Sequence, residues 1–156
     1  MEVSNNIGSL IDSKAQILVH QVNCQGRMGS GIAKTIRDTY PMVYDEYMKY
    51  CERHPDPKMR LGNINLVKVS NKQAICNLFG QLQYGYDGKR YTSYDAVSDA
   101  LEKLRDFCVE KGVKSIAFPK NMGCGLGGAR WPVVGMMILE IFDKTDLQIE
   151  LWTYNG

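Results

Sequence analysis

Two glycine-rich stretches hold the residues of this sequence that are best suited to bind an anion. Residues 26–31 have the sequence GRMGSG, and residues 123–128 have the sequence GCGLGG. Each stretch follows an apolar run and precedes an amphipathic pattern, so each is expected to lead into a helix. Backbone N–H groups and the helix dipole favour negative charge at such a position. Together the two stretches predict a site for two phosphates or for one diphosphate.

The glycine stretches can be compared with other known kinds of phosphate-binding and catalytic loops. A P-loop needs a lysine directly after its last glycine, whereas Lys34 lies further along the chain. The second stretch fits G-x-G-x-x-G, but too little chain follows it to build a dinucleotide-binding fold. Cys124 and Arg130 have the C-x₅-R spacing of cysteine-dependent phosphatases, and a helix N-terminus favours a thiolate. Tight turns without a ligand are the remaining alternative.

Composition favours a single domain in a reducing compartment. The length of 156 residues is typical of one domain, and 44% hydrophobic residues suffice for a core. The net charge of +2 argues against a dedicated nucleic-acid-binding protein. The five cysteines include no C-x-x-C pair, which disfavours a zinc cluster or a disulfide framework and favours the cytoplasm. We expect no signal peptide, membrane span, metal or cofactor.

Regular elements are expected to place both glycine stretches at one edge of a sheet. Strands are predicted at residues 15–23, 63–69, 73–79, 113–119 and 147–154, and helices at residues 29–40, 42–54, 93–112 and 131–145. Residues 54–59 are predicted to be a loop. Ser93 and Gly112 are expected to cap the third helix. The alternation predicts one layered α/β domain over residues 1–156, with ligands beyond the carboxyl ends of the strands.

The two stretches and their flanks resemble the signatures of the macro domain, an ADP-ribose-binding module. ILVHQVNCQGRMGSGIAKTIRDTYP (17–41) resembles the first signature, and IAFPKNMGCGLGGARW (116–131) resembles the second. The resemblance covers nearly the whole chain, including NLFGQ (77–81), and implies a three-layer α/β/α fold with a mixed sheet. It is closest to the branch that includes the yeast ADP-ribose 1''-phosphate phosphatase and the human terminal ADP-ribose protein glycohydrolase.

The resemblance also implies a role for individual residues in ligand binding. Asn6, Ile7 and Trp152 correspond to the adenine side, and Asn23 faces the distal ribose, which the loop containing Gln81 covers. The first phosphate loop would use Gly26, Met28, Gly29, Ser30, Gly31 and Ile32, and the second would use Asn121, Met122, Gly123, Cys124, Gly125, Leu126 and Gly127.

The chemistry implied by the resemblance depends on which catalytic residues are present. The glycohydrolase branch uses a lysine at the end of the central strand and an aspartate in the second loop. This sequence has Gly80 or Gln81 at the first position and Gly127 at the second. The phosphatase member shares the histidine and the Asn-Cys pair, so His20 and Asn23 are the expected catalytic residues. An imidazole with a pKa near 6.5 suits proton transfer at neutral pH, and a buried structural histidine is the alternative.

These observations predict an enzyme that hydrolyses ADP-ribose 1''-phosphate to ADP-ribose and phosphate. The alternatives are a non-catalytic ADP-ribose reader, an ADP-ribosyl hydrolase without the lysine and aspartate pair, and a cysteine-dependent phosphatase. The expected partners are ADP-ribose or ADP-ribose 1''-phosphate and, in the reader or hydrolase role, an ADP-ribosylated macromolecule. We expect a monomer with no membrane partner.

Overall fold

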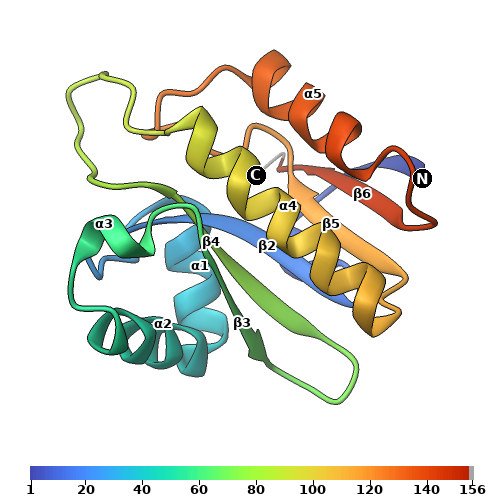
Figure 1. Ribbon diagram of the computed structural model, residues 1–156, viewed down its shortest axis with the longest axis horizontal. Helices are drawn as coiled ribbons and strands as arrows, with labels where there is room; N and C mark the ends of the chain where they lie inside the picture. Colours follow the sequence, from blue (N-terminus) through green and yellow to red (C-terminus); the bar gives the residue numbers. More distant parts are fainter. Residues whose placement is uncertain (155–156) are drawn as a thin grey trace.

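Six strands form one mixed sheet in the order β1-β6-β5-β2-β4-β3. The computed structural model describes residues 1–154 (Figure 1). The strands are β1 (Glu2–Ile7), β2 (Ile17–Asn23), β3 (Ile64–Lys68), β4 (Ala74–Gln81), β5 (Ser115–Pro119) and β6 (Gln148–Thr153). All neighbouring strands pair in parallel except β3 and β4, which form an antiparallel hairpin.

Helices cover both faces of this sheet. They are α1 (Gly31–Thr39), α2 (Pro41–Arg53), α3 (Pro57–Arg60), α4 (Tyr94–Lys111) and α5 (Trp131–Phe142), with a short 3₁₀ turn at Leu10–Asp12. Helices α4 and α5 pack on one face, in front of the sheet in Figure 1, and α1 and α2 pack on the other. Each face buries its own hydrophobic cluster. The predicted three-layer α/β/α architecture is therefore confirmed.

Helix α4 shows how closely local sequence sets an element. The Ser93 Oγ accepts a hydrogen bond from Ala96 N (3.2 Å), which satisfies one of the free N–H groups of the first turn. Gly112 ends the helix with φ 67°, a left-handed conformation that favours glycine. Buried side chains recur at helical spacing on the face toward the sheet, at Ala96, Val97, Ala100, Leu101, Leu104 and Cys108. Both predicted caps are confirmed.

The structure differs from the prediction at several elements. The sequence did not predict β1, because its side chains are mostly exposed and it is held by parallel pairing with β6. The predicted loop at 54–59 contains the start of α3, whose first turn is capped by Asp56 Oδ1 accepting from Lys58 N. Helix α5 ends at Phe142, three residues before the predicted end at 145. No helix in the described part of the chain is long and apolar enough to cross a membrane.

Candidate functional site

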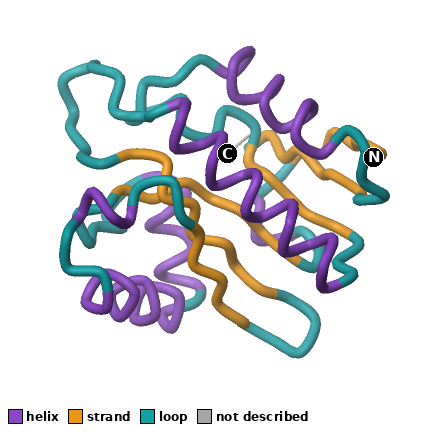
Figure 2. Tube along the Cα trace, viewed as in Figure 1, coloured by secondary structure: helices purple, strands orange, loops and turns teal. Residues whose placement is uncertain are grey.

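Three loops meet at the carboxyl edge of the sheet. Strands β5, β2 and β4 are parallel neighbours, so the segments that follow them leave the sheet on the same side. Loop 1 (residues 24–30) follows β2, loop 2 (residues 120–130) follows β5, and the β4–α4 loop (residues 82–93) follows β4. The β4–α4 loop is the long loop at the upper left of Figure 2. The structure thus brings both predicted glycine stretches to adjacent positions.

Side chains hold loop 1 in place from below. The Asn23 Oδ1 accepts from Gln25 N (2.9 Å), and its Nδ2 donates to Arg27 O (2.9 Å). The buried Tyr47 of α2 donates through Oη to Asn23 O (2.7 Å) and accepts from Gly26 N (3.0 Å). Asn23 therefore uses its amide to shape loop 1, and burial raises the pKa of Tyr47, so that it stays a neutral phenol.

Arg60 fixes the first residue of loop 1 to the end of α2. Its guanidinium donates to the carbonyl oxygens of Cys24 (2.6 Å), Cys51 (2.9 Å), His54 (2.7 Å) and Pro55 (3.2 Å). Only 9% of Arg60 is exposed, and no carboxylate among the described residues pairs with it. A cation at the C-terminal end of a helix also interacts favourably with the helix dipole.

The upper side of loop 1 is open. A Cβ atom built on Gly29 or on Gly31 meets no heavy atom within 4 Å. Within residues 1–154, the backbone N–H groups of residues 28–33 have no hydrogen-bond acceptor, and Ser30 does not cap α1 with its side chain. The predicted residues Ser30 and Ile32 contribute these N–H groups. Unpaired N–H groups at a helix start favour an anion.

Loop 2 combines a packed base with an open tip. The Gly127 O accepts from Tyr91 N (2.8 Å) and Thr92 N (2.9 Å), and a Cβ built on Gly127 lies 2.6 Å from Gly123 O. Only glycine fits there. At the tip, Gly125 has open space around its Cβ position and Leu126 is exposed. The N–H groups of residues 125–127 have no acceptor within the described chain.

A neutral polar junction connects β2, β4 and loop 2. The Gln21 Nε2 donates to Gln81 Oε1 (2.8 Å) and to Thr92 Oγ1 (2.8 Å), and Thr92 Oγ1 donates to Gly123 O (2.9 Å). Gln81 Oε1 lies 3.2 Å from the Cβ position of Gly127. The positions at which the resemblance implied a lysine and an aspartate are therefore adjacent. Here they carry an amide and a glycine.

His20 lies inside the protein rather than at this edge. It is fully buried on the sheet face covered by α1 and α2, and its Nε2 donates to Asn77 Oδ1 (2.6 Å). Asn77 Nδ2 donates in turn to Asn65 Oδ1 (3.0 Å). Burial lowers the pKa of His20 to about 4, so the ring is neutral at physiological pH. This geometry favours the structural alternative, because the ring has no surface that a ligand could contact.

The C-x₅-R spacing does not produce a phosphatase nucleophile. Cys124 Sγ contacts Met122 O at 3.4 Å, and burial raises the pKa of the Cys124 thiol. Arg130 directly precedes α5, where its N–H donates to Tyr94 Oη (3.0 Å), and no bond joins its side chain to Cys124. A reactive cysteine needs a lowered pKa. The cysteine-dependent phosphatase is therefore not supported.

The predicted apolar contacts fall into buried and exposed groups. Met28 and Met122 are almost fully buried, one in each hydrophobic cluster, so only their backbone can face the loops. Leu126 and Ile7 are exposed, Ile7 at the end of β1 with 74% of its surface accessible. Asn121 has an exposed side chain at the start of loop 2, where its carbonyl accepts from Cys124 N (2.9 Å).

The residues that the resemblance places on the adenine side lie where β1 pairs with β6. Asn6 stands opposite Trp152 in the register, and its amide donates to Ser4 Oγ (3.1 Å). The Trp152 ring packs 3.3 Å from the Cβ position of Gly8, and its Nε1 donates to Glu150 Oε1 (2.8 Å). The half-buried indole thus lies beside Gly8, directly after the end of β1.

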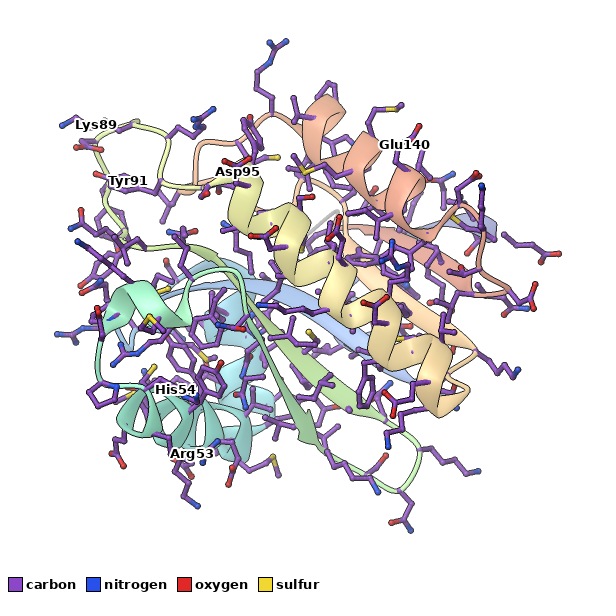
Figure 3. The ribbon with its side chains drawn as sticks, viewed as in Figure 1. Arg53, His54, Lys89, Tyr91, Asp95 and Glu140 are labelled. Carbon is purple, nitrogen blue, oxygen red and sulfur yellow. The ribbon has the colours of Figure 1, made fainter. Side chains whose placement is uncertain are left out.

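The β4–α4 loop packs against loop 2 and carries exposed aromatic and basic side chains. Tyr84 and Tyr86 are 42% and 71% exposed. Tyr91 Oη donates to Asp87 Oδ1 (2.8 Å), which ties the two ends of the loop tip together, and Lys89 extends outward (Figure 3).

Sequence reasoning missed the residues that support the loops. They are Gln21, Tyr47, Arg60 and Thr92, which lie far apart in the sequence. A polar glutamine inside an apolar strand is a signal that could have identified Gln21.

Known proteins resemble this chain in sequence and structure. It is 27% identical over 147 residues to a DNA ADP-ribosyl glycohydrolase of Thermus aquaticus, covering 94% of this chain and 39% of that protein. It is 27% identical to human ADP-ribose glycohydrolase OARD1, covering 90% and 83%. An ADP-ribose 1''-phosphate phosphatase of Meyerozyma guilliermondii is 31% identical over 109 residues, covering 65% and 62%. The chain spans about two fifths of the length of the bacterial relative.

The structural comparison agrees with the sequence comparison. The macrodomain of Thermus aquaticus DarG superposes with a TM-score of 0.78 at 27% identity, covering 99% of both chains. The model of the macro domain family matches residues 19–137, which include most of β2, both glycine loops and the first part of α5. The chain therefore belongs to the macro domain family.

Proposed function

We propose that this macro domain binds ADP-ribose between loop 1 and loop 2 and hydrolyses ADP-ribose 1''-phosphate to ADP-ribose and phosphate. The observation that carries the proposal is the pair of unpaired N–H rows, at residues 28–33 and 125–127, on neighbouring loops. Unpaired backbone N–H groups favour phosphate groups, and a diphosphate has two phosphates, one for each row. The relatives named above, which act on ADP-ribose compounds, support the ligand class.

The proposed reaction is attack of water on the phosphorus of the 1''-phosphate. The bond between phosphorus and the oxygen of C1'' breaks, a proton from the attacking water passes to that oxygen, and phosphate and ADP-ribose with a C1'' hydroxyl are released. The chain contributes positioning of the ligand and stabilisation of the developing charge by backbone N–H groups. Asn23 acts by holding loop 1. His20 does not touch the ligand in this scheme, since it is fully buried.

A reader of ADP-ribose on a modified macromolecule is the second candidate. The neutral junction of Gln21, Gln81 and Thr92 favours it, because no ionised side chain stands where glycohydrolases of the resembling branch carry their catalytic pair. A lysine-dependent mechanism needs an amine at that position. An ADP-ribosyl hydrolase acting without that pair remains a third reaction that the same ligand site would serve.

Phosphorus NMR of the protein with excess ADP-ribose 1''-phosphate tests the proposal directly. Release of free phosphate over many equivalents is the expected result for the enzyme. Broadened diphosphate signals with no phosphate release would establish the reader and overturn the hydrolysis. Unchanged ligand signals would overturn both.

Gly125→Glu connects the activity to the loops. The glutamate would place a side chain and a negative charge at the open tip of loop 2, beside the free N–H groups. We expect ADP-ribose affinity to fall at least about 100-fold, from steric exclusion and charge repulsion. Asn71→Glu adds the same charge in the exposed β3–β4 turn, at the opposite end of β4, and is expected to bind normally. Full affinity in Gly125→Glu would place the ligand elsewhere.

A further inference from the structure

The side chain of Gln21 reaches from β2 into the base of loop 2. Its Nε2 has two acceptors, Gln81 Oε1 and Thr92 Oγ1, both at 2.8 Å. Thr92 is 2% exposed and passes the contact on to Gly123 O (2.9 Å). The backbone N–H of Thr92 also donates to Gly127 O (2.9 Å). One amide group is therefore bonded, through Thr92, to both ends of the segment that carries the free N–H groups of loop 2.

The other end of the same amide is confined by two glycines. Gln21 Oε1 is buried and has no hydrogen-bond donor in the described chain. It lies 2.5 Å from the Cβ position of Gly80 and 2.7 Å from that of Gly123. The oxygen thus rests against both glycine backbones, where only weak C–H···O contacts can satisfy it. Burying an acceptor without a donor lowers the free energy of unfolding. The side chain is nevertheless held there by the two hydrogen bonds of its Nε2.

We propose that Gln21 is the positioning residue of loop 2. Through Thr92 it fixes the position of the Gly123–Gly127 backbone relative to β4. The direction in which the N–H groups of residues 125–127 point depends on that position. Gln21 itself contacts no ligand. The effect on ADP-ribose rests on the proposed function, whereas the effect on the loop backbone does not.

Gly80 offers an independent check because the three atoms nearest to its Cβ position all belong to Gln21. It lies within β4 and does not adopt a left-handed conformation, so an alanine fits its backbone. The atoms nearest to its Cβ position are Oε1, Cδ and Cγ of Gln21, at 2.5, 2.7 and 3.0 Å. A methyl group there must displace the Gln21 side chain. Gly80→Ala and Gln21→Ala are therefore expected to disturb the same contact from opposite sides.

The experiment combines amide NMR with ADP-ribose titration. In ligand-free Gln21→Met, which keeps the length of the side chain but has no donor, we expect shifted amide signals for Gly123, Gly125 and Gly127. Signals of Gly26 and Gly29 in loop 1 should stay in place. Calorimetric titration should show affinity for ADP-ribose reduced about tenfold, the scale of losing two hydrogen bonds. Gln148→Met, at an exposed site in β6, is the matched control.

The double variant separates positioning from general damage. Gln21→Ala with Gly80→Ala should bind ADP-ribose no more weakly than Gln21→Ala alone, because the second change has nothing left to displace. Additive losses, or loop 2 signals that do not move in Gln21→Met, would overturn the proposal. If Gln21→Met does not fold, Gln21→Asn replaces it, because it keeps the amide on a shorter side chain. The loop 2 amide shifts and the loss of affinity with and without Gly80→Ala are then judged in the same way. If the wild-type protein does not bind ADP-ribose in the titration, the proposed function is refuted. The amide NMR spectra of the ligand-free variants would still decide the role of Gln21.

Discussion

The two glycine loops present similar N–H groups but are built in opposite ways. Loop 1 is held by side chains that reach it from α2 and α3, above all Tyr47 and Arg60, and its glycines at 29 and 31 have open space around them. Loop 2 is closely packed at its base, where the Cβ positions of Gly123 and Gly127 lie against backbone atoms and the side chains of Gln21 and Thr92, so that only glycine fits. Similar binding surfaces can therefore be supported by side chains beside open glycines in one case, and by close packing around glycines in the other.

Removing Arg60 should have the largest effect on stability. Arg60→Met keeps the length of the side chain but leaves the buried carbonyl oxygen of Cys24 without a donor and removes one of the two donors to Cys51 O, the other being His54 N. We expect a loss of about 3 kcal/mol in the free energy of unfolding, measured by urea denaturation. Loop 1 signals should broaden more than loop 2 signals in the NMR spectrum. Equal broadening of both loops would show that Arg60 does not support loop 1 specifically.

The same glycine-to-alanine change should separate the loops. In Gly127→Ala the new methyl would lie 2.6 Å from Gly123 O, so the backbone must shift, and we expect a loss of about 2 kcal/mol. Gly29→Ala meets nothing within 4 Å and should be neutral or slightly stabilising, since alanine lowers the entropy of the unfolded chain. Thermal unfolding of the two variants beside wild type measures the difference. A destabilised Gly29→Ala would show that loop 1 also depends on its glycines.

Acid should lower the free energy of unfolding through His20, which lies on the face of β2 toward α1 and α2. His20 has a pKa of about 4 when folded and about 6.5 when unfolded, so the unfolded chain takes up a proton first as the pH falls. The stability that this histidine contributes is complete above pH 6.5 and is lost toward pH 4. Between pH 6.5 and 5 we expect wild type to lose about 1.5 kcal/mol more than His20→Gln. Parallel pH profiles in urea denaturation would contradict the lowered pKa.

A smaller loss than that of Arg60→Met or Gly127→Ala is expected for Tyr47→Phe, which removes one hydroxyl beneath loop 1. The substitution breaks the bonds to Asn23 O and from Gly26 N and keeps the packing of the ring against Phe79. We expect a loss of about 1 kcal/mol and a several-fold weaker affinity for ADP-ribose. Tyr50→Phe in the same helix is the control, because its ring also packs against Phe79 and its hydroxyl does not bond to loop 1. Indistinguishable variants would show that the hydroxyl does not position the loop.

Local features of the sequence predicted much of the fold. Ser93 and Gly112 mark the ends of α4, and the apolar run before Asn23 marks β2, because caps and buried strands are determined by neighbouring residues. Strand β1 escaped prediction because its pairing with β6, which lies at the other end of the chain, determines it.

The site was predictable only in part for the same reason. The glycine stretches are visible as local composition, and the structure places them side by side. The environment of His20 is a tertiary property, since Asn77 of β4, which bonds to its ring, lies 57 residues further along the chain. The same holds for Arg60, whose partners are carbonyl groups that no sequence pattern reveals.

The way in which Arg60 is satisfied has a consequence for the conditions under which loop 1 keeps its shape. A guanidinium stays charged at every pH a cell experiences, and the carbonyl oxygens that accept its hydrogen bonds do not titrate. Because the contact is shielded from solvent, dissolved electrolyte screens it only weakly. The anchor of loop 1 is thus insensitive to both acidity and ionic strength, even where the rest of the molecule responds to them.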